Sequence, residues 1–232
     1  MARRTDIYGG VRPEDVPAYS SAEAARLVRV PAATLRSWVF GRDYVTQGGP
    51  RRFRGLIEAP PGSDGYLTFT NVVEAHVLAS MRRDYHLELK SIRSAIEYVQ
   101  QKMGVAHPLV HERFKTDGAD LFVEHLGELV NVTRKGQLAM QAILTVHLER
   151  IEYEKHRAVR FFPLFRGEAT PRLVVVDPRR AFGRPVLQGT SVPVESVRAR
   201  FDAGDSVSVL ARDYEVAPEL IEEALRATSQ AA

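Results

Sequence analysis

The residues whose chemistry is easiest to interpret are arginines near the amino terminus. The first 60 residues carry ten arginines and no lysine against six acidic residues. Arginine presents a planar, permanently charged fork that binds phosphate or guanine through paired hydrogen bonds. The residues that we expect to contact duplex DNA are Thr34, Arg36, Ser37, Arg42, Tyr44, Arg51, Arg52 and Arg54. A solvated basic surface on an ordinary helical hairpin is the competing interpretation of the same composition.

A second group of arginines and phenylalanines lies between residues 157 and 184. Aromatic side chains and arginine, with little lysine, are typical of the residues that dominate protein interfaces. The residues that we expect to bind a protein partner are Arg157, Arg160, Phe162, Phe165, Arg166, Arg179, Arg180 and Arg184. The competing interpretation of the phenylalanines is an amphipathic strand whose aromatic side chains fill the core.

Residues for catalysis or metal binding are sparse. The chain has no cysteine, which excludes disulfides, thiolate metal sites and a thiol nucleophile. His107 and His111 are four residues apart, but Pro108 disfavours the helix that would direct both at one metal ion. Asp117, Asp120 and Glu124 are more typical of a solvated turn than of a metal site. We therefore expect no catalytic site, no metal and no cofactor.

The overall composition is that of a folded globular protein. The 232 residues are 44% hydrophobic and 26% charged, with a net charge of +3. Residues 191–232 carry four arginines against eight acidic residues, so this end has the opposite charge to the first 60 residues. No apolar run approaches the roughly 18 residues of a membrane span. No apolar segment follows the basic amino terminus, so we expect a cytoplasmic protein.

The amino-terminal elements are expected to form a helix-turn-helix and a wing. Residues 20–23 have the spacing of a capping box, which predicts a helix over residues 22–28. Residues 32–39 form a second predicted helix with apolar residues three and four apart. The glycines, prolines and arginines of residues 41–65 predict a β-hairpin wing.

Further elements follow the wing. We predict a closing strand over residues 66–69 and then a helix that is capped by Thr70 or Asn71 and ends near residue 83. Another amphipathic helix is predicted over residues 87–103. Since it lies beyond the DNA-reading part, it is the expected element of dimer contact.

The middle of the chain is expected to contain a small antiparallel sheet and one helix. The predicted elements are strands at residues 113–118, 121–124, 129–133 and 152–165 and a helix at residues 137–149. Residues 167–171 have the composition of a linker. In the last part we predict a strand over residues 173–176 and helices over residues 194–203, 207–213 and 218–227.

Together these elements predict an α+β fold that is mainly α. The expected domains are residues 1–104, which bind DNA, a β-rich region at 105–170, and a three-helix domain at 171–232. The last two helices form a second helix-turn-helix, but its acidic residues oppose DNA binding. We therefore expect protein contact or dimer packing there.

Part of the chain resembles known families. Residues 19–27 and the run Thr34-Leu35-Arg36-Ser37-Trp38 resemble the winged helix-turn-helix of MerR-type regulators, and the resemblance continues to about residue 100. The wing is longer than is usual in that family. This resemblance implies DNA binding by the second helix and the wing.

The carboxyl-terminal part has a resemblance of its own. Residues 177–193, 200–206 and 210–214 resemble a small helical domain of uncharacterised function that is common in antitoxins of VapBC-type pairs. The toxins of such pairs are PIN-domain ribonucleases, whose sites hold divalent metal in a cluster of carboxylates. An arginine inserted into such a cluster would pair with the carboxylates and exclude substrate.

These resemblances imply an antitoxin that neutralises a PIN-domain toxin and, as a homodimer, represses its own operon by binding operator DNA. The alternative is a MerR-like regulator that senses a small molecule through its middle region and has no toxin partner. A metal-dependent hydrolase using His107 and His111 is a third, weaker hypothesis.

Overall fold

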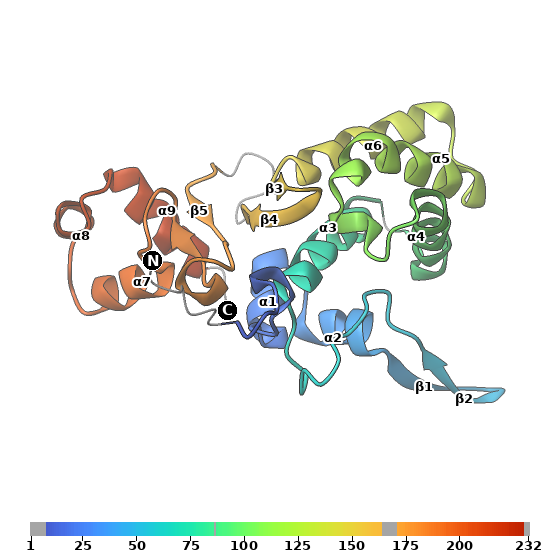
Figure 1. The fold of residues 1–232 in the computed structure, drawn as a ribbon, viewed down its shortest axis with the longest axis horizontal. Coiled ribbons are helices and arrows are strands. Elements are labelled where there is room, and N and C mark those ends of the chain that lie inside the picture. Colours follow the sequence, from blue (N-terminus) through green and yellow to red (C-terminus); the bar gives the residue numbers. More distant parts are fainter. Residues whose placement is uncertain (1–7, 86, 164–170, 230–232) are drawn as a thin grey trace.

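The computed structural model describes residues 8–85, 87–163 and 171–229. Its amino-terminal part is a pair of helices followed by a long β-hairpin, as the sequence predicts. The elements of this part are α1 (Ser21–Val28), α2 (Ala32–Phe40), β1 (Arg42–Thr46) and β2 (Gly49–Phe53). The hairpin extends away from the body of the molecule as a wing beside α2 (Figure 1).

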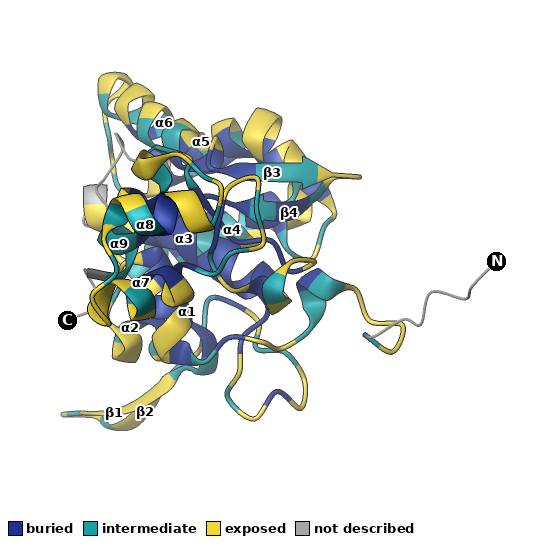
Figure 2. Ribbon diagram, turned by 90° about the vertical axis from the view of Figure 1, so that its left-hand side faces the viewer, coloured by how far each residue is buried: buried dark blue, intermediate teal, exposed yellow. Residues whose placement is uncertain are grey.

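Helix α3 (Phe69–Tyr85) is the central element of the fold. Every residue from Leu67 to Met81 is buried, and Figure 2 shows the helix enclosed by its neighbours. The predicted closing strand at residues 66–69 is wrong, because only Leu67 forms a bridge, with Tyr19, and Phe69 already begins the helix. The predicted cap at Thr70 or Asn71 is also wrong, since both residues lie inside the helix. Thr68 is the cap: its Oγ1 accepts a hydrogen bond from the Asn71 backbone N–H (3.1 Å).

The next three helices are α4 (Leu89–Met103), α5 (Ala119–Leu129) and α6 (Arg134–Leu148). They pack in series, since α6 packs against α3, and α5 lies between α6 and α4. The apolar face of α4, which comprises Ile92, Ala95, Val99 and Met103, is buried inside the molecule. The helix predicted as the dimer element therefore already uses this face within its own chain.

The predicted strands between residues 113 and 133 are wrong, since this segment is helical. A π-helical turn (Phe114–Gly118) leads into α5, and residues 130 and 131 form the turn after it. Asp-Gly is a common sequence in hairpin turns, which favours a turn at Asp117-Gly118, but Gly118 has helical dihedral angles (φ −72°, ψ −33°). A Cβ there would lie 2.8 Å from the Met103 sulfur, so this glycine permits close packing.

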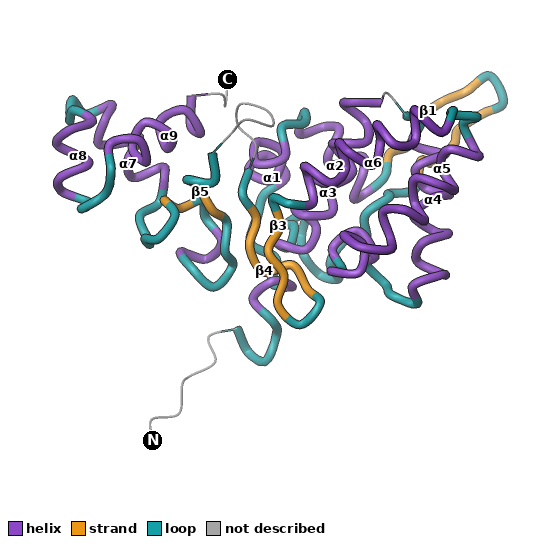
Figure 3. Tube along the Cα trace, turned by 90° about the horizontal axis from the view of Figure 1, so that it is seen from above, coloured by secondary structure: helices purple, strands orange, loops and turns teal. Residues whose placement is uncertain are grey.

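A β-hairpin replaces the single strand predicted at residues 152–165. Strands β3 (Ile151–Glu154) and β4 (Arg157–Phe161) pair antiparallel around a two-residue turn. Lys155 and His156 have φ values of 49° and 66°, as this turn requires. In Figures 1 and 3 the hairpin lies between the amino-terminal helices and the carboxyl-terminal unit. The predicted linker lies almost wholly outside the described residues.

The carboxyl-terminal unit agrees with the prediction. It consists of the short antiparallel pair β5 (Val174–Val175) and β6 (Val186–Leu187) and of α7 (Val194–Asp202), α8 (Val207–Asp213) and α9 (Pro218–Ser229). The three-helix domain and its second helix-turn-helix are therefore present. The α+β, mainly α fold is confirmed. None of the helices in the described part of the chain is both long and apolar enough to cross a bilayer.

One hydrophobic core joins the first two predicted regions. Buried side chains from Tyr19 to Phe161 belong to a single cluster, which therefore crosses the expected division near residue 104. The carboxyl-terminal helices have a core of their own. Three successive valines connect these layers, because Val174 lies in the carboxyl-terminal core, Val175 packs with Phe162, and Val176 belongs to the large core.

The first prediction concerns the contact that holds the carboxyl-terminal unit to α1. Gly183 has φ +79°, and a Cβ there would lie 2.1 Å from Tyr19 Oη, which donates a buried hydrogen bond to the Gly183 carbonyl (3.0 Å). Gly183→Ala should lower the free energy of unfolding by about 3 kcal/mol in urea titrations, through strain and the displaced tyrosine. The matched control is Gly189→Ala, with φ +80° and no atom within 4 Å. It should cost only about 1 kcal/mol. Equal losses for both variants would contradict the role of the Tyr19 contact.

Candidate nucleic-acid interface

The first helix of the helix-turn-helix is fixed by its own sequence. Ser20 Oγ accepts a hydrogen bond from the Glu23 backbone N–H (3.2 Å), and the Ser20 N–H donates to the Glu23 carboxylate (2.8 Å). This reciprocal pair is the predicted capping box, and the Ser20 contact lowers the pKa of Glu23. The helix ends at Arg29, whose left-handed backbone (φ 57°) turns the chain toward α2.

The second helix presents one arginine to solvent. Leu35, Trp38 and Val39 are buried in the large core, which fixes the rotation of α2 about its axis. Arg36 is exposed, and its guanidinium carbon lies 5.7 Å from the centre of the Phe40 ring. Thr34 and Ser37, the other two predicted contacts on this helix, are half-buried. Arg36 is therefore the predicted side chain of α2 that is most accessible to a base edge or a phosphate.

The wing has two chemically different faces. Because Tyr44 is paired with Arg51 and Arg42 with Phe53 in the strand register, Arg42, Tyr44 and Arg51 share one face. The other face carries Arg52 and Asp43, whose exposed side chains form an ion pair at 3.4 Å. Among the described residues, neither Arg42 nor Arg51 forms an ion pair with a carboxylate. The first face therefore has the positive charge that a phosphate backbone attracts.

The base of the wing is tied to the carboxyl end of α2. The backbone N–H groups of Leu56 and Ile57 both donate to the Trp38 carbonyl, at 2.6 and 3.0 Å. The chain that follows β2 passes so close to α2 that a Cβ at Gly55 would lie 2.3 Å from the Val39 carbonyl oxygen. A rigid connection of this kind sets the angle between the helix and the wing.

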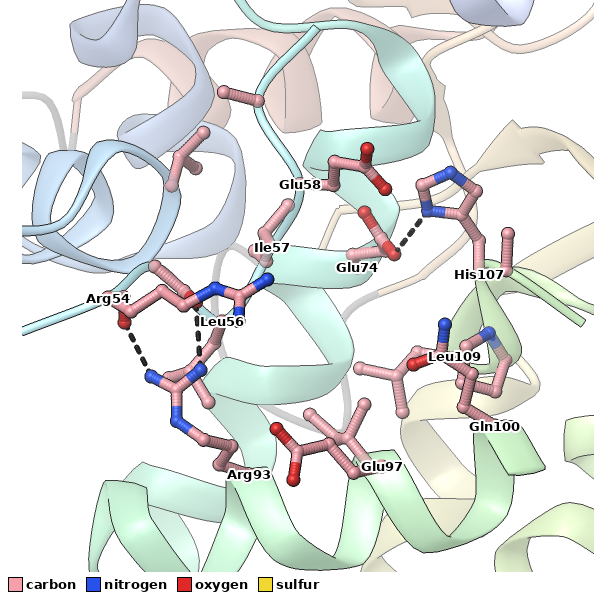
Figure 4. Close-up of a pocket in the computed structure, with 16 residues that line it drawn as sticks. Arg54, Leu56, Ile57, Glu58, Glu74, Arg93, Glu97, Gln100, His107 and Leu109 are labelled. Atoms are coloured by element: carbon pink, nitrogen blue, oxygen red, sulfur yellow. Dashed lines mark hydrogen bonds and ion pairs between the residues drawn. The ribbon is translucent and has the colours of Figure 1, made fainter. Parts of the chain in front are cut away.

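A residue that the sequence did not identify secures this connection. Arg93 on α4 donates hydrogen bonds to the carbonyls of Gly55 (3.0 Å) and Arg54 (Figure 4). Its guanidinium also lies 5.4 Å from the centre of the Phe53 ring. We call these contacts of Arg93 with residues 53–55 the clamp. The side chain of Arg54 itself is exposed beside it. The sequence signal was only an arginine within an amphipathic helix, and its partners lie 38 and 39 residues away.

A cavity of about 380 Å³ lies beside the clamp. It is lined by wing-base residues 54–59 and by side chains of α3 and α4, among them Glu74 and Glu97 (Figure 4). His107 Nδ1 lies 3.0 Å from the buried Glu74 carboxylate, and this hydrogen bond raises the pKa of His107. His107 thus joins the 106–109 segment to α3.

The histidines of the metal hypothesis have separate partners. His107 contacts Glu74, whereas the His111 ring stacks on that of His156 with centroids 5.7 Å apart. Within residues 8–85, 87–163 and 171–229, no group of three or more histidine or acidic side chains is arranged to hold a metal ion. The exposed Asp117 and Asp120 lie in the helical segment at the start of α5.

Three of the arginines predicted to bind a protein partner form ion pairs within the chain. Arg157 contacts Asp15 (3.1 Å) and Arg160 contacts both Asp177 and Glu152 (3.0 Å each). Arg179 contacts Glu14 (3.1 Å) and Glu154 (2.8 Å). Arg160 donates hydrogen bonds to the carboxylates of Asp177 and Glu152, and these bonds raise the pKa of its guanidinium. These pairs join the β3–β4 hairpin to the amino-terminal segment and to the start of the carboxyl-terminal unit.

The remaining predicted partner residues have different surroundings. Phe162 is buried with Val175 and Val186, so its ring is a core residue. Phe165 and Arg166 lie outside the described residues. Arg180 and Arg184 are exposed on the turn that follows β5, and Arg180 donates a hydrogen bond to the Thr190 carbonyl (3.3 Å).

Comparisons with known proteins agree with this division of the chain. Residues 17–96 match a family described as "Putative DNA-binding HTH domain", and residues 174–226 match one described as "Protein of unknown function (DUF433)". The crystal structure of Rv2018 from Mycobacterium tuberculosis has a TM-score of 0.69 and 27% identity, over 91% of this chain and 98% of that one.

Two curated proteins of Mycobacterium tuberculosis are similar over nearly the whole chain. "Uncharacterized protein Rv2308" is 24% identical over 93% of this chain and 92% of its own length. "Putative antitoxin VapB45" is 33% identical over 92% of this chain and 94% of its own length. Because that identity extends through both units of the fold, the chain belongs to the family of VapB45.

Proposed function

We propose that this chain is an antitoxin that binds and neutralises a PIN-domain ribonuclease toxin and represses its own operon by binding operator DNA. The observation that carries the DNA-binding part is the unpaired arginine face of the wing, held at a fixed angle to α2 by the Trp38 carbonyl. The name of the VapB45 relative and the helix-turn-helix match support the same proposal.

In this proposal α2 lies in the major groove and the wing lies along the phosphate backbone. Arg36 contacts a base edge or a phosphate, with Thr34 and Ser37 beside it at the groove wall. Arg42, Tyr44 and Arg51 contact phosphates from the unpaired face of the wing. Arg54 contacts a phosphate from the base of the wing, and Arg52 does so from the edge of the opposite face, in exchange for its exposed ion pair with Asp43. One such unit covers only a short stretch of DNA, so we propose that a homodimer binds an inverted repeat.

In the toxin-binding part, Arg180 and Arg184 are the predicted arginines that face solvent without a carboxylate partner in the described structure. The ion pairs of Arg157, Arg160 and Arg179 instead hold the segments that carry this turn. The toxin therefore binds to the carboxyl-terminal unit, away from the wing.

The cavity at the wing base supports one alternative function, a regulator that responds to a small molecule. Its walls include the segment that sets the wing angle, so a ligand there would alter the wing. A metabolite that changes operator affinity at least tenfold in the purified chain, together with failure to bind the neighbouring PIN-domain protein, would favour this alternative.

The proposed interaction with a toxin is tested by co-expressing the full-length chain with the PIN-domain protein encoded beside its gene. We expect a complex that survives size-exclusion chromatography at micromolar concentration and suppresses the ribonuclease activity of that protein. The absence of any complex under these conditions would remove the antitoxin proposal and leave DNA binding to be judged separately.

For DNA, we expect steep salt dependence with a log–log slope of about −0.9 per phosphate neutralised. Arg51→Ala should weaken operator binding to all sequences alike and make the slope shallower by about 0.9, since one phosphate contact is lost. The matched control is Arg212→Ala, which removes the same charge from the exposed surface of α8. Equal slopes for Arg51→Ala and the parent chain, measured by fluorescence anisotropy, would remove the wing face from the DNA contact.

A separate prediction distinguishes positioning of the wing from contact with DNA. Arg93→Ala releases the carbonyls of Arg54 and Gly55, so we expect operator affinity to fall about tenfold while the salt slope is unchanged. Lys90→Ala removes the same charge from an exposed position on the same helix and should have no effect. A shallower slope for Arg93→Ala would show instead that this arginine neutralises a phosphate.

A further inference from the structure

The turn between β5 and β6 holds a phenylalanine in solvent. Phe182 is 68% exposed, which is the largest exposed fraction among the phenylalanine, tyrosine and tryptophan residues whose burial the structure describes. Isolated exposed aliphatic residues are common, but an exposed aromatic ring of this size is characteristic of a binding surface. Its neighbours in sequence and space indicate what kind of surface this is.

The backbone at this turn is strained. Ala181 and Phe182 have φ values of 46° and 54°, in the left-handed region that side chains with a Cβ rarely adopt. Strained non-glycine residues of this kind persist only where the surroundings hold them, and they are concentrated at functional sites. Here an asparagine or glycine at residue 182 would relieve the strain, yet the chain has a large apolar side chain at this position.

Several hydrogen bonds maintain this conformation. The Gly183 N–H donates to the Arg180 carbonyl (2.9 Å) and the Arg184 N–H to the Ala181 carbonyl (3.1 Å). Tyr19 Oη binds the Gly183 carbonyl from the amino-terminal unit (3.0 Å), and burial raises the pKa of this tyrosine, so it remains a donor. The Phe182 ring is therefore presented by a turn that is fixed on both sides.

Charge defines the chemistry of a complementary surface. Arg180 and Arg184, two residues before and after Phe182, form no ion pair with a carboxylate among the described residues. Their neighbours Arg160 and Arg179 form two ion pairs each. The chain thus neutralises the arginines that it uses at the junction. Beside the exposed ring it leaves Arg180 without a described carboxylate within ion-pair distance, and Arg184 interacts with Glu23 only at a longer range than an ion pair. Such a combination fits an apolar hollow with carboxylates at its rim.

A groove of about 420 Å³ continues this surface, and its walls combine apolar side chains with charged residues, among them Glu23, Glu195 and Asp202. Phe182, Arg184 and Pro185 form one side, and residues of α1, α7 and α9, among them Leu27 and Val194, form the rest. A partner that encloses the Phe182 ring therefore lies next to this groove and can place one of its own apolar side chains in it. The surface is continuous across the amino-terminal and carboxyl-terminal units.

We infer that Phe182 is the anchor residue of the toxin interface, inserted into an apolar hollow of the toxin whose rim carboxylates pair with Arg180 and Arg184. This inference rests on the proposed antitoxin function and adds the residue on which affinity depends. It also gives the strained turn a role, because a ring that is already fixed loses little conformational entropy on binding.

The test uses Phe182→Gly, since glycine tolerates the left-handed backbone. This variant should unfold at the same or a higher urea concentration than the parent chain and should still bind operator DNA. Its Kd for the co-purified PIN-domain protein, measured by isothermal titration calorimetry, should rise at least about 30-fold, as for an interface hot spot. Phe182→Ala, which keeps the strain and removes the ring, should show the same loss.

The matched control is Phe201→Ala, which removes a ring that is 40% exposed on α7 of the same unit, and it should change the Kd less than about twofold. Unchanged affinity for both Phe182 variants would overturn the inference while leaving the antitoxin proposal intact. Failure of the parent chain to bind the PIN-domain protein would instead overturn the proposed function. Loss of self-association in Phe182→Gly, with full toxin affinity, would assign the surface to a second copy of this chain and also overturn the inference.

Discussion

The pairing of Phe161 with Val176 is the contact on which the arrangement of the whole chain depends. Two reciprocal backbone hydrogen bonds of 3.0 and 2.8 Å join the end of β4 to the chain that enters the carboxyl-terminal unit. Since Val174, Val175 and Val176 pack in three different clusters, a shift of one residue would move each valine out of its core. The register of this short pairing therefore places the Phe182 turn beside α1, where Tyr19 binds it.

Arginine serves two opposite purposes in this molecule, and the surroundings decide which. At the junction, Glu14 and Asp177 are buried carboxylates, which would be costly without a partner, and Arg179 and Arg160 supply the compensating charges. On the wing, the arginines of one face have no such partners and their charge extends into solvent. Both sets looked equally suited to binding in the sequence, because composition does not show which acidic residues will be neighbours.

Local signals predicted the amino-terminal unit well. The capping box at Ser20 and the spacing of Leu35 and Trp38 specify helices without help from distant residues, and three of the predicted DNA contacts lie on the second of these helices. Predictions failed where packing decides the conformation. Gly118 lies in a helical segment, where Phe114 and Met103 leave no room for a Cβ, and the tight turn at Lys155 lacks the usual Asn-Gly signal. Arg93 was missed since its acceptors are backbone carbonyls, which every residue has.

The two helix-turn-helix pairs of this chain show that architecture alone does not specify a DNA reader. In the three carboxyl-terminal helices and their connections each of the four arginines lies within 4 Å of a carboxylate: Arg198 near Asp202, Arg200 near Asp205 and Asp213, Arg212 near Asp213, and Arg226 near Glu222. Glu215 and Glu219 remain exposed, so this surface has an excess of negative charge. A DNA phosphate would have to displace these ion pairs and approach carboxylates that have no arginine partner. One face of the wing instead presents guanidinium groups that form no ion pair with a carboxylate in the described part of the chain. The same supersecondary motif is thus suited to a polyanion at one end of the chain and to a polypeptide at the other.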